Sequence, residues 1–192
     1  MEDSILPRMF WPLVLAHGLA LLSPGPDFIL IVSNGIRHAW RGAALLCVGI
    51  AAGNALYVGM AVAGWLGWGG SPGLQQILQP VGAAYLGWLG VRLLASSRTA
   101  LPDPGGAASM LPPLRQLAVG FGSAALNPKN MVFYLAIMTT IIEKEAGLRQ
   151  RLAAGIWMCL AVLAWDLFLA GVASRRKVRL FLRIHLPKIE IA

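Results

Sequence analysis

The chain has 192 residues, of which 57% are hydrophobic and only 12% are charged, and its formal net charge is +8. Soluble domains are about 45–50% apolar and about 25% charged, so this composition argues against an ordinary soluble domain and excludes a disordered chain. Cys47 and Cys159 stand singly inside apolar runs, so the sequence contains no CxxC pair and no disulfide framework.

Several apolar segments are long enough to cross a bilayer core, which takes roughly 20 residues of helix. In chain order, they are residues 9–32, 43–66, 76–95, 117–142 and 152–173. A Pro- and Gly-rich stretch between the third and fourth segments has the composition of a loop, and nothing beside it could form a separate soluble core. We therefore predict an all-α integral membrane protein with five transmembrane helices in a single membrane domain, residues 1–192.

Charged residues near the segment ends indicate an orientation. The first eight residues contain Glu2 and Asp3 as well as Arg8, so the N-terminus lacks the basic region of a cleaved signal peptide. The first segment is therefore predicted to remain in the protein as a membrane helix. Eleven Lys and Arg residues fall on the side of the C-terminal tail and four on the other, and such an excess marks the cytoplasmic side. The N-terminus is therefore predicted outside and the basic tail in the cytosol. Attraction to anionic lipid explains that tail better than nucleic-acid binding does.

The first segment is interrupted by proline. Pro24, Gly25 and Pro26 cannot continue a regular helix, because each proline lacks a donor and clashes with the preceding turn. At membrane depth, the freed backbone groups are tolerated only against protein or a water-filled cavity. Asp27 follows directly, and a carboxylate inside a membrane helix costs about 2.5–3.5 kcal/mol on insertion scales. This combination predicts a functional site at the break.

A second interruption lies three segments later, where Asn127, Pro128 and Lys129 stand inside the fourth apolar run. Matched breaks in two halves of a chain indicate an inverted-repeat transporter whose site lies between them. Because each half holds an odd number of helices, the halves take opposite orientations. We therefore predict a 3+3 inverted repeat with proline-broken first and fourth helices.

Asp166 is the second carboxylate inside an apolar segment. It is either part of the same pathway or a structural lock paired with a basic group. Lys129 and Asp27 likewise either contact a ligand or pair with each other.

Motifs for other chemistry are missing. The sequence has no Walker-type loop, no HExxH or Cys/His cluster, and no recognisable Ser/His/Asp constellation. We therefore expect neither ATP hydrolysis, nor a metal site, nor a cofactor, and we do not expect an enzyme.

At these residues the chain resembles the LysE/RhtB family of bacterial amino-acid exporters, over roughly residues 5 to 190. The positions that carry the resemblance are residues 23–28, Gly35, Arg41, Gly42, Gly49, Ile50, Gly53, residues 82–90, Gly120, Phe121, residues 127–129 and Asp166.

The resemblance implies a six-helix exporter of the bacterial cytoplasmic membrane, driven by protons. It implies that the motifs around Asp27 and Lys129 face each other and line the substrate pathway. In this hypothesis the substrate carboxylate meets helix amino ends and Lys129, its ammonium meets Asp27, and a proton exchanges at Asp27 or Asp166. The family's sixth helix would begin where this chain ends. The repeats are then residues 9–95 and an incomplete 116–192, joined by a loop over 96–115.

Two alternatives remain open at this point. One is an exporter of cations or other small metabolites on the same scaffold, and the other is a truncated membrane protein that does not transport. Small-residue helix faces are compatible with a homodimer and equally with packing inside one chain.

Overall fold

The structure, a computed structural model, describes residues 9–68, 109–140 and 146–178, together with positions 76, 80, 84 and 91. Helices and short connections make up these residues, and no strand occurs among them, in agreement with the predicted all-α class. The predicted third segment, residues 76–95, lies outside the described residues apart from those four positions.

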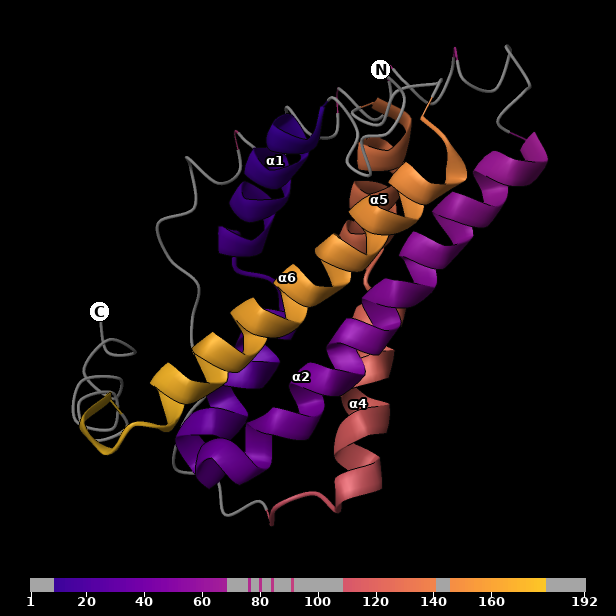
Figure 1. Cartoon of the computed structure of the whole chain (residues 1–192). Helices are drawn as coiled ribbons and strands as arrows, with labels where there is room; N and C mark the ends of the chain where they lie inside the picture. Colours follow the sequence, from indigo (N-terminus) through magenta and orange to yellow (C-terminus); the bar gives the residue numbers. More distant parts are fainter. Residues whose placement is uncertain are drawn as a thin grey trace. The chain divides into compact units, whose positions relative to one another are not determined.

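Five helices account for most of the described chain (Figure 1). They are α1 (Phe10–Leu22), α2 (Pro26–Trp68), α4 (Pro113–Ala125), α5 (Pro128–Thr140) and α6 (Leu148–Ser174). Two of them, Pro26–Met60 within α2 and Leu148–Ser174, are long and apolar enough to span a membrane. The predicted count of five spanning helices and the inverted repeat stay predictions.

The chain forms two compact units. The first contains Met1–Ser23, Asn54–Ser97 and Ala125–Ala161, and the second contains the three stretches between and after these. Each unit draws residues from both predicted repeats, so the division into repeats along the sequence stays a prediction. The two units are described separately below.

Helix α2 is longer than one membrane crossing requires. Its 43 residues would extend about 65 Å as a straight helix, roughly twice the bilayer core. Ala39 interrupts it with φ 58° and ψ −157°, and the chain reverses there (Figure 1). The first two apolar segments end at residue 32 and begin again at residue 43, and the reversal at Ala39 lies in the connection between them. Helical residues continue up to the reversal and resume directly after it.

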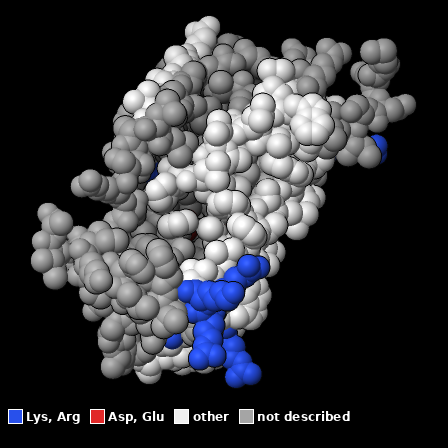
Figure 2. Space-filling view, turned by 90° about the vertical axis from the view of Figure 1, so that its left-hand side faces the viewer, with Lys and Arg blue, Asp and Glu red and all other residues white. Residues whose placement is uncertain are grey.

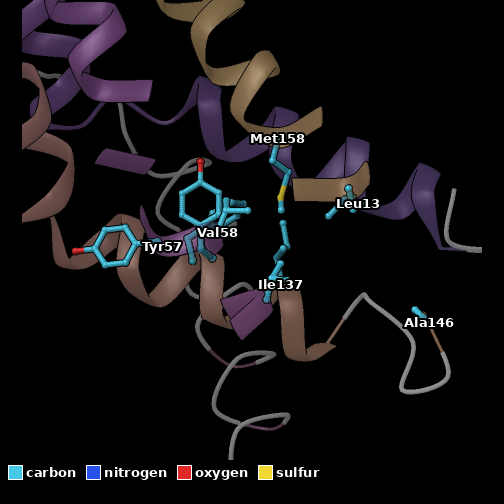
Figure 3. Close-up of a cluster of buried hydrophobic side chains, with 10 residues drawn as sticks. Leu13, Tyr57, Val58, Ile137, Ala146 and Met158 are labelled. Atoms are coloured by element: carbon cyan, nitrogen blue, oxygen red, sulfur yellow. The ribbon is translucent and has the colours of Figure 1, made fainter. Parts of the chain in front are cut away.

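The first unit is built around an apolar core from α1, the end of α2, α5 and the start of α6. Met158 of α6 extends towards Ile137 of α5, with Leu13 of α1 beside them, and all three are fully buried (Figure 3). Val58 of α2 joins the same cluster and contacts Gly155 of α6, where an added Cβ would lie 2.6 Å from the valine side chain.

The second unit brings α2 and α4 into backbone contact. A Cβ at Gly120 would meet the Leu46 backbone, and one at Gly49 would lie 2.8 Å from the Phe121 nitrogen. Only glycine, whose side chain is a single hydrogen atom, allows the two backbones to approach this closely. Small residues allow such close packing between membrane helices. Gly49 and Gly120 therefore serve close packing of these two helices.

The outer face of α6 is apolar. Leu152, Ile156, Leu160 and Phe168 recur at four-residue intervals or multiples of four, and they are between 45% and 60% exposed. Such a stripe is unfavourable in water and matches the hydrocarbon of a bilayer. The position of these side chains agrees with a membrane protein.

Candidate functional site

The first predicted helix break is present. Helix α1 ends at Leu22, Ser23 is extended with ψ 113°, and α2 begins at Pro26. Pro26 occupies the first helical position, where its missing N–H costs nothing, and the Gly25 carbonyl accepts the Ile29 N–H at 3.1 Å. Asp27 then stands in the first turn of α2, where the helix dipole favours a negative charge.

Lys129 reaches the carbonyl side of this break. Its Nζ donates a hydrogen bond of 2.9 Å to the Ser23 oxygen, and both groups belong to the first unit. Carbonyls at the end of a helix lack internal partners and carry partial negative charge, so a lysine here is favourable. The structure therefore gives Lys129 a partner that the sequence analysis did not consider.

The second break has its own cap. Helix α4 ends at Ala125 and α5 begins at Pro128, as the sequence predicts. Asn127 is only 5% exposed, and its Oδ1 accepts the Lys129 N–H at 3.0 Å. Its carbonyl accepts the Asn130 N–H at 3.1 Å. Asparagine is a preferred residue at this position, so the local geometry explains the Asn-Pro-Lys order as a helix start.

Tyr57 is a residue that the sequence analysis missed. Its hydroxyl donates to the carbonyl of Ala125, the last residue of α4, within the first unit. A buried phenol needs a polar partner, and a carbonyl freed by a helix break supplies one. The available signal was a tyrosine in the middle of an uncharged apolar run.

Asp27 is held by another missed residue, Ser123 of α4. The Ser123 hydroxyl donates to Asp27 Oδ1 at 2.5 Å inside the second unit, and both side chains are half-buried. Bonds to a charged acceptor are shorter and stronger than neutral ones. The signal for Ser123 was a hydroxyl placed four residues before Asn127 in an apolar helix.

Asp166 and Asp27 belong to the same unit. The opening of α2 packs against the end of α6 there, because a Cβ at Gly35 would lie 2.9 Å from Ala173 Cβ. Asp27 precedes Gly35 by about 12 Å of helix, and Asp166 precedes Ala173 by about 10 Å, so the carboxylates share a level.

The environment of Asp166 bears on the two interpretations of that residue. It is 5% exposed, and its Oδ2 accepts no hydrogen bond from any described residue. A buried carboxylate used as a structural lock would have its oxygens paired with a base. Both interpretations of Asp166 stay predictions.

The predicted site residues thus fall into two groups. Asp27, Pro26 and Asp166 belong to the second unit, and Asn127, Pro128 and Lys129 belong to the first. That the two groups serve one pathway stays a prediction.

Known proteins resemble the chain over most of its length. The LysE type translocator family model matches residues 19–189. The threonine efflux protein of Salmonella typhi is 25% identical, over 89% of this chain and 84% of that protein. The leucine efflux protein of Enterobacter sp. (strain 638) is 30% identical, over 71% and 65%. The uncharacterized membrane protein YrhP of Bacillus subtilis is 31% identical, over 83% and 80%. No solved structure matches the chain.

Proposed function

The chain belongs to the LysE type translocator family, and on this basis we propose that it exports amino acids or their derivatives across the bacterial cytoplasmic membrane. Relatives named threonine and leucine efflux proteins support this substrate class. They favour a neutral amino acid such as threonine or leucine over a basic one. The N-terminus is outside and the basic tail is cytosolic in this proposal.

The observation that carries the proposal is the pair of helix breaks, each with an ionisable residue. An amino acid presents a carboxylate and an ammonium group. The starts of α2 and α5 offer backbone amides to the carboxylate, as helix amino ends do for anions. Lys129 exchanges the Ser23 carbonyl for that carboxylate, and Asp27 receives the ammonium group.

Export against a gradient requires an energy source. In this proposal the source is the proton gradient, and carboxylates inside the membrane couple export to it. Asp27 and Asp166 are the described carboxylates of the second unit, and a carboxylate can bind and release a proton. We assign proton exchange to Asp27 and Asp166. When the ammonium group of the substrate binds Asp27 it replaces the proton as the neutralising cation, and this competition couples the two fluxes.

The same two carboxylates favour one alternative, the export of a cation on this scaffold. A cation exporter would need the acidic pair but not Lys129 or the helix amino ends. A panel of amino acids and inorganic cations therefore separates the two functions, and so does the Lys129→Gln variant, which impairs amino-acid export alone.

The test is efflux from cells preloaded with a mixed amino-acid pool. We expect cells that express the protein to lose one class of amino acid faster than empty cells. We expect Asp27→Asn to abolish this difference at equal abundance in the membrane. Unchanged efflux from Asp27→Asn would refute the assigned role of Asp27. No difference between wild type and empty cells, for any amino acid, would refute amino-acid export.

A further inference from the structure

A cluster of basic side chains covers one end of the second unit. Four exposed cations make up this basic patch, and they are Arg41, Arg175, Arg176 and Lys177. Figure 2 shows Lys and Arg side chains gathered at one end of the face in view, with no acidic side chain among them. The patch combines the turn of α2 with the end of α6.

Close packing of these two elements makes the patch one surface. A Cβ at Gly35 of α2 would lie 2.9 Å from Ala173 Cβ, one residue before the end of α6. A Cβ at Gly171 would lie 3.8 Å from the ring of Trp40. The residue after Trp40 and the residues after Ser174 therefore extend from neighbouring positions.

The patch lacks a described counter-charge. None of its four side chains forms a hydrogen bond or an ion pair with the residues that the structure places. Asp27 and Asp166 are the described carboxylates of this unit, and they precede Arg41 and Arg175 by 14 and 9 residues along the chain. The cations that follow α6 interact favourably with the negative end of its helix dipole. This interaction does not explain Arg41, which lies on another helix.

Apolar side chains border the patch on α6 and α2. Phe168 is 59% exposed and Trp40 is 46% exposed. Phe168 and Gly171 follow at i and i+3 and so share one side of α6, and Arg175 comes directly after the last residue of this helix. Along this side an exposed ring is followed by the Trp40 contact and then by the cations. That is the order of groups at a membrane surface, where aromatic rings lie at headgroup level and cations meet lipid phosphate.

We propose that the basic patch binds the phosphate headgroup of an anionic phospholipid, whose acyl chains lie along Phe168 and Trp40. Nucleic acid fits less well, because the apolar border continues into the lipid-facing stripe of α6. The inference concerns binding and stands apart from the proposed export. Each cation near a membrane surface contributes about fivefold to the affinity, so loss of three reduces it on the order of 100-fold.

The test uses the purified full-length protein and a fluorescent phosphatidylglycerol, with binding followed by energy transfer from tryptophan. The triple variant Arg175→Gln, Arg176→Gln, Lys177→Gln should bind this lipid about 100-fold more weakly. The single variant Arg41→Gln should bind it about fivefold more weakly. Arg149→Gln, an exposed cation at the other end of α6, is the matched control and should bind as wild type does.

Three outcomes would overturn the proposal. They are unchanged binding by the triple variant, an equal loss in the Arg149 control, and equal affinity for phosphatidylcholine. Displacement of the lipid by millimolar inorganic phosphate would show a site for free anions instead. Arg41→Gln keeps the test valid if the triple variant does not fold, because Arg41 lies outside α6 and only one charge changes.

Discussion

Removal of the Ser123 hydroxyl should impair Asp27 without touching the carboxylate itself. The hydroxyl donates to Asp27 Oδ1 at 2.5 Å. Alanine at this position removes the donor, and it does not weaken the helix because alanine has a high helix propensity. The side chain of Asp27 would then lose the contact that fixes its direction. Because Asp27 is the proposed receptor for the substrate ammonium group, export depends on that direction.

The geometry sets the size of the effect. A hydrogen bond to a charged group contributes about 1.5–3 kcal/mol. Both partners are half-buried, so water can partly replace the lost hydroxyl, and the lower part of that range, about 1.5–2 kcal/mol, applies. At 1.36 kcal/mol for each factor of ten, Ser123→Ala should lower export about 10- to 30-fold at equal abundance.

The assay is initial efflux from preloaded cells for Ser123→Ala, Asp27→Asn and the double variant. The double variant should be no worse than Asp27→Asn, because the hydroxyl acts through the carboxylate. Ser33→Ala is the matched control, since its hydroxyl donates to the Leu30 carbonyl of its own helix at 3.1 Å, and it should export as wild type does. Wild-type efflux from Ser123→Ala would refute the reasoning.

Three further variants test the packing and the breaks. Gly49→Ala should lower the free energy of unfolding by about 1–3 kcal/mol, because the added Cβ overlaps the backbone of α4. Gly122→Ala should leave it unchanged, because there is open space around Gly122. Equal melting temperatures of the two variants in detergent would contradict this prediction. Tyr57→Phe should lower the free energy of unfolding by about 0.5–1.5 kcal/mol, because the hydrogen bond to the carbonyl at the end of α4 is lost. An unchanged denaturation midpoint would contradict this contribution of the hydrogen bond. Lys129→Met should destabilise the protein by about 1 kcal/mol or more and Lys129→Arg by less, because the bond to Ser23 needs a cation; equal stability of both variants would argue against that bond.

The helix breaks were predictable from sequence because proline acts locally. Pro26 and Pro128 each start a helix after a break, as their fixed φ and missing N–H require. The turn of α2 was not predictable in this way. Ala39 adopts a backbone conformation that favours glycine, and its immediate neighbours contain neither glycine nor proline. A reversal between residues 32 and 43 was expected from the two apolar segments, but nothing in the local pattern indicates that it is confined to Ala39.

The hydrogen-bond partners of the site residues were also not predictable from the sequence. Ser123 lies 96 positions from Asp27, and Tyr57 lies 68 positions from Ala125. Hydropathy and propensity describe neighbours along the chain, whereas these bonds depend on which helices pack together. The small residues of α2 and α4 indicated close packing, but they did not identify the hydroxyl that this packing brings to the carboxylate.

The bond between Lys129 and Ser23 has a consequence for biosynthesis. Its two partners are 106 positions apart, so a ribosome adding about 5–20 residues each second completes the end of α1 roughly 5–20 s before it adds the lysine. During this interval the Ser23 carbonyl depends on water or on the insertion machinery for a partner. The break after α1 therefore gains this bond only once the start of α5 has been made, and a nascent chain arrested before α5 would lack it.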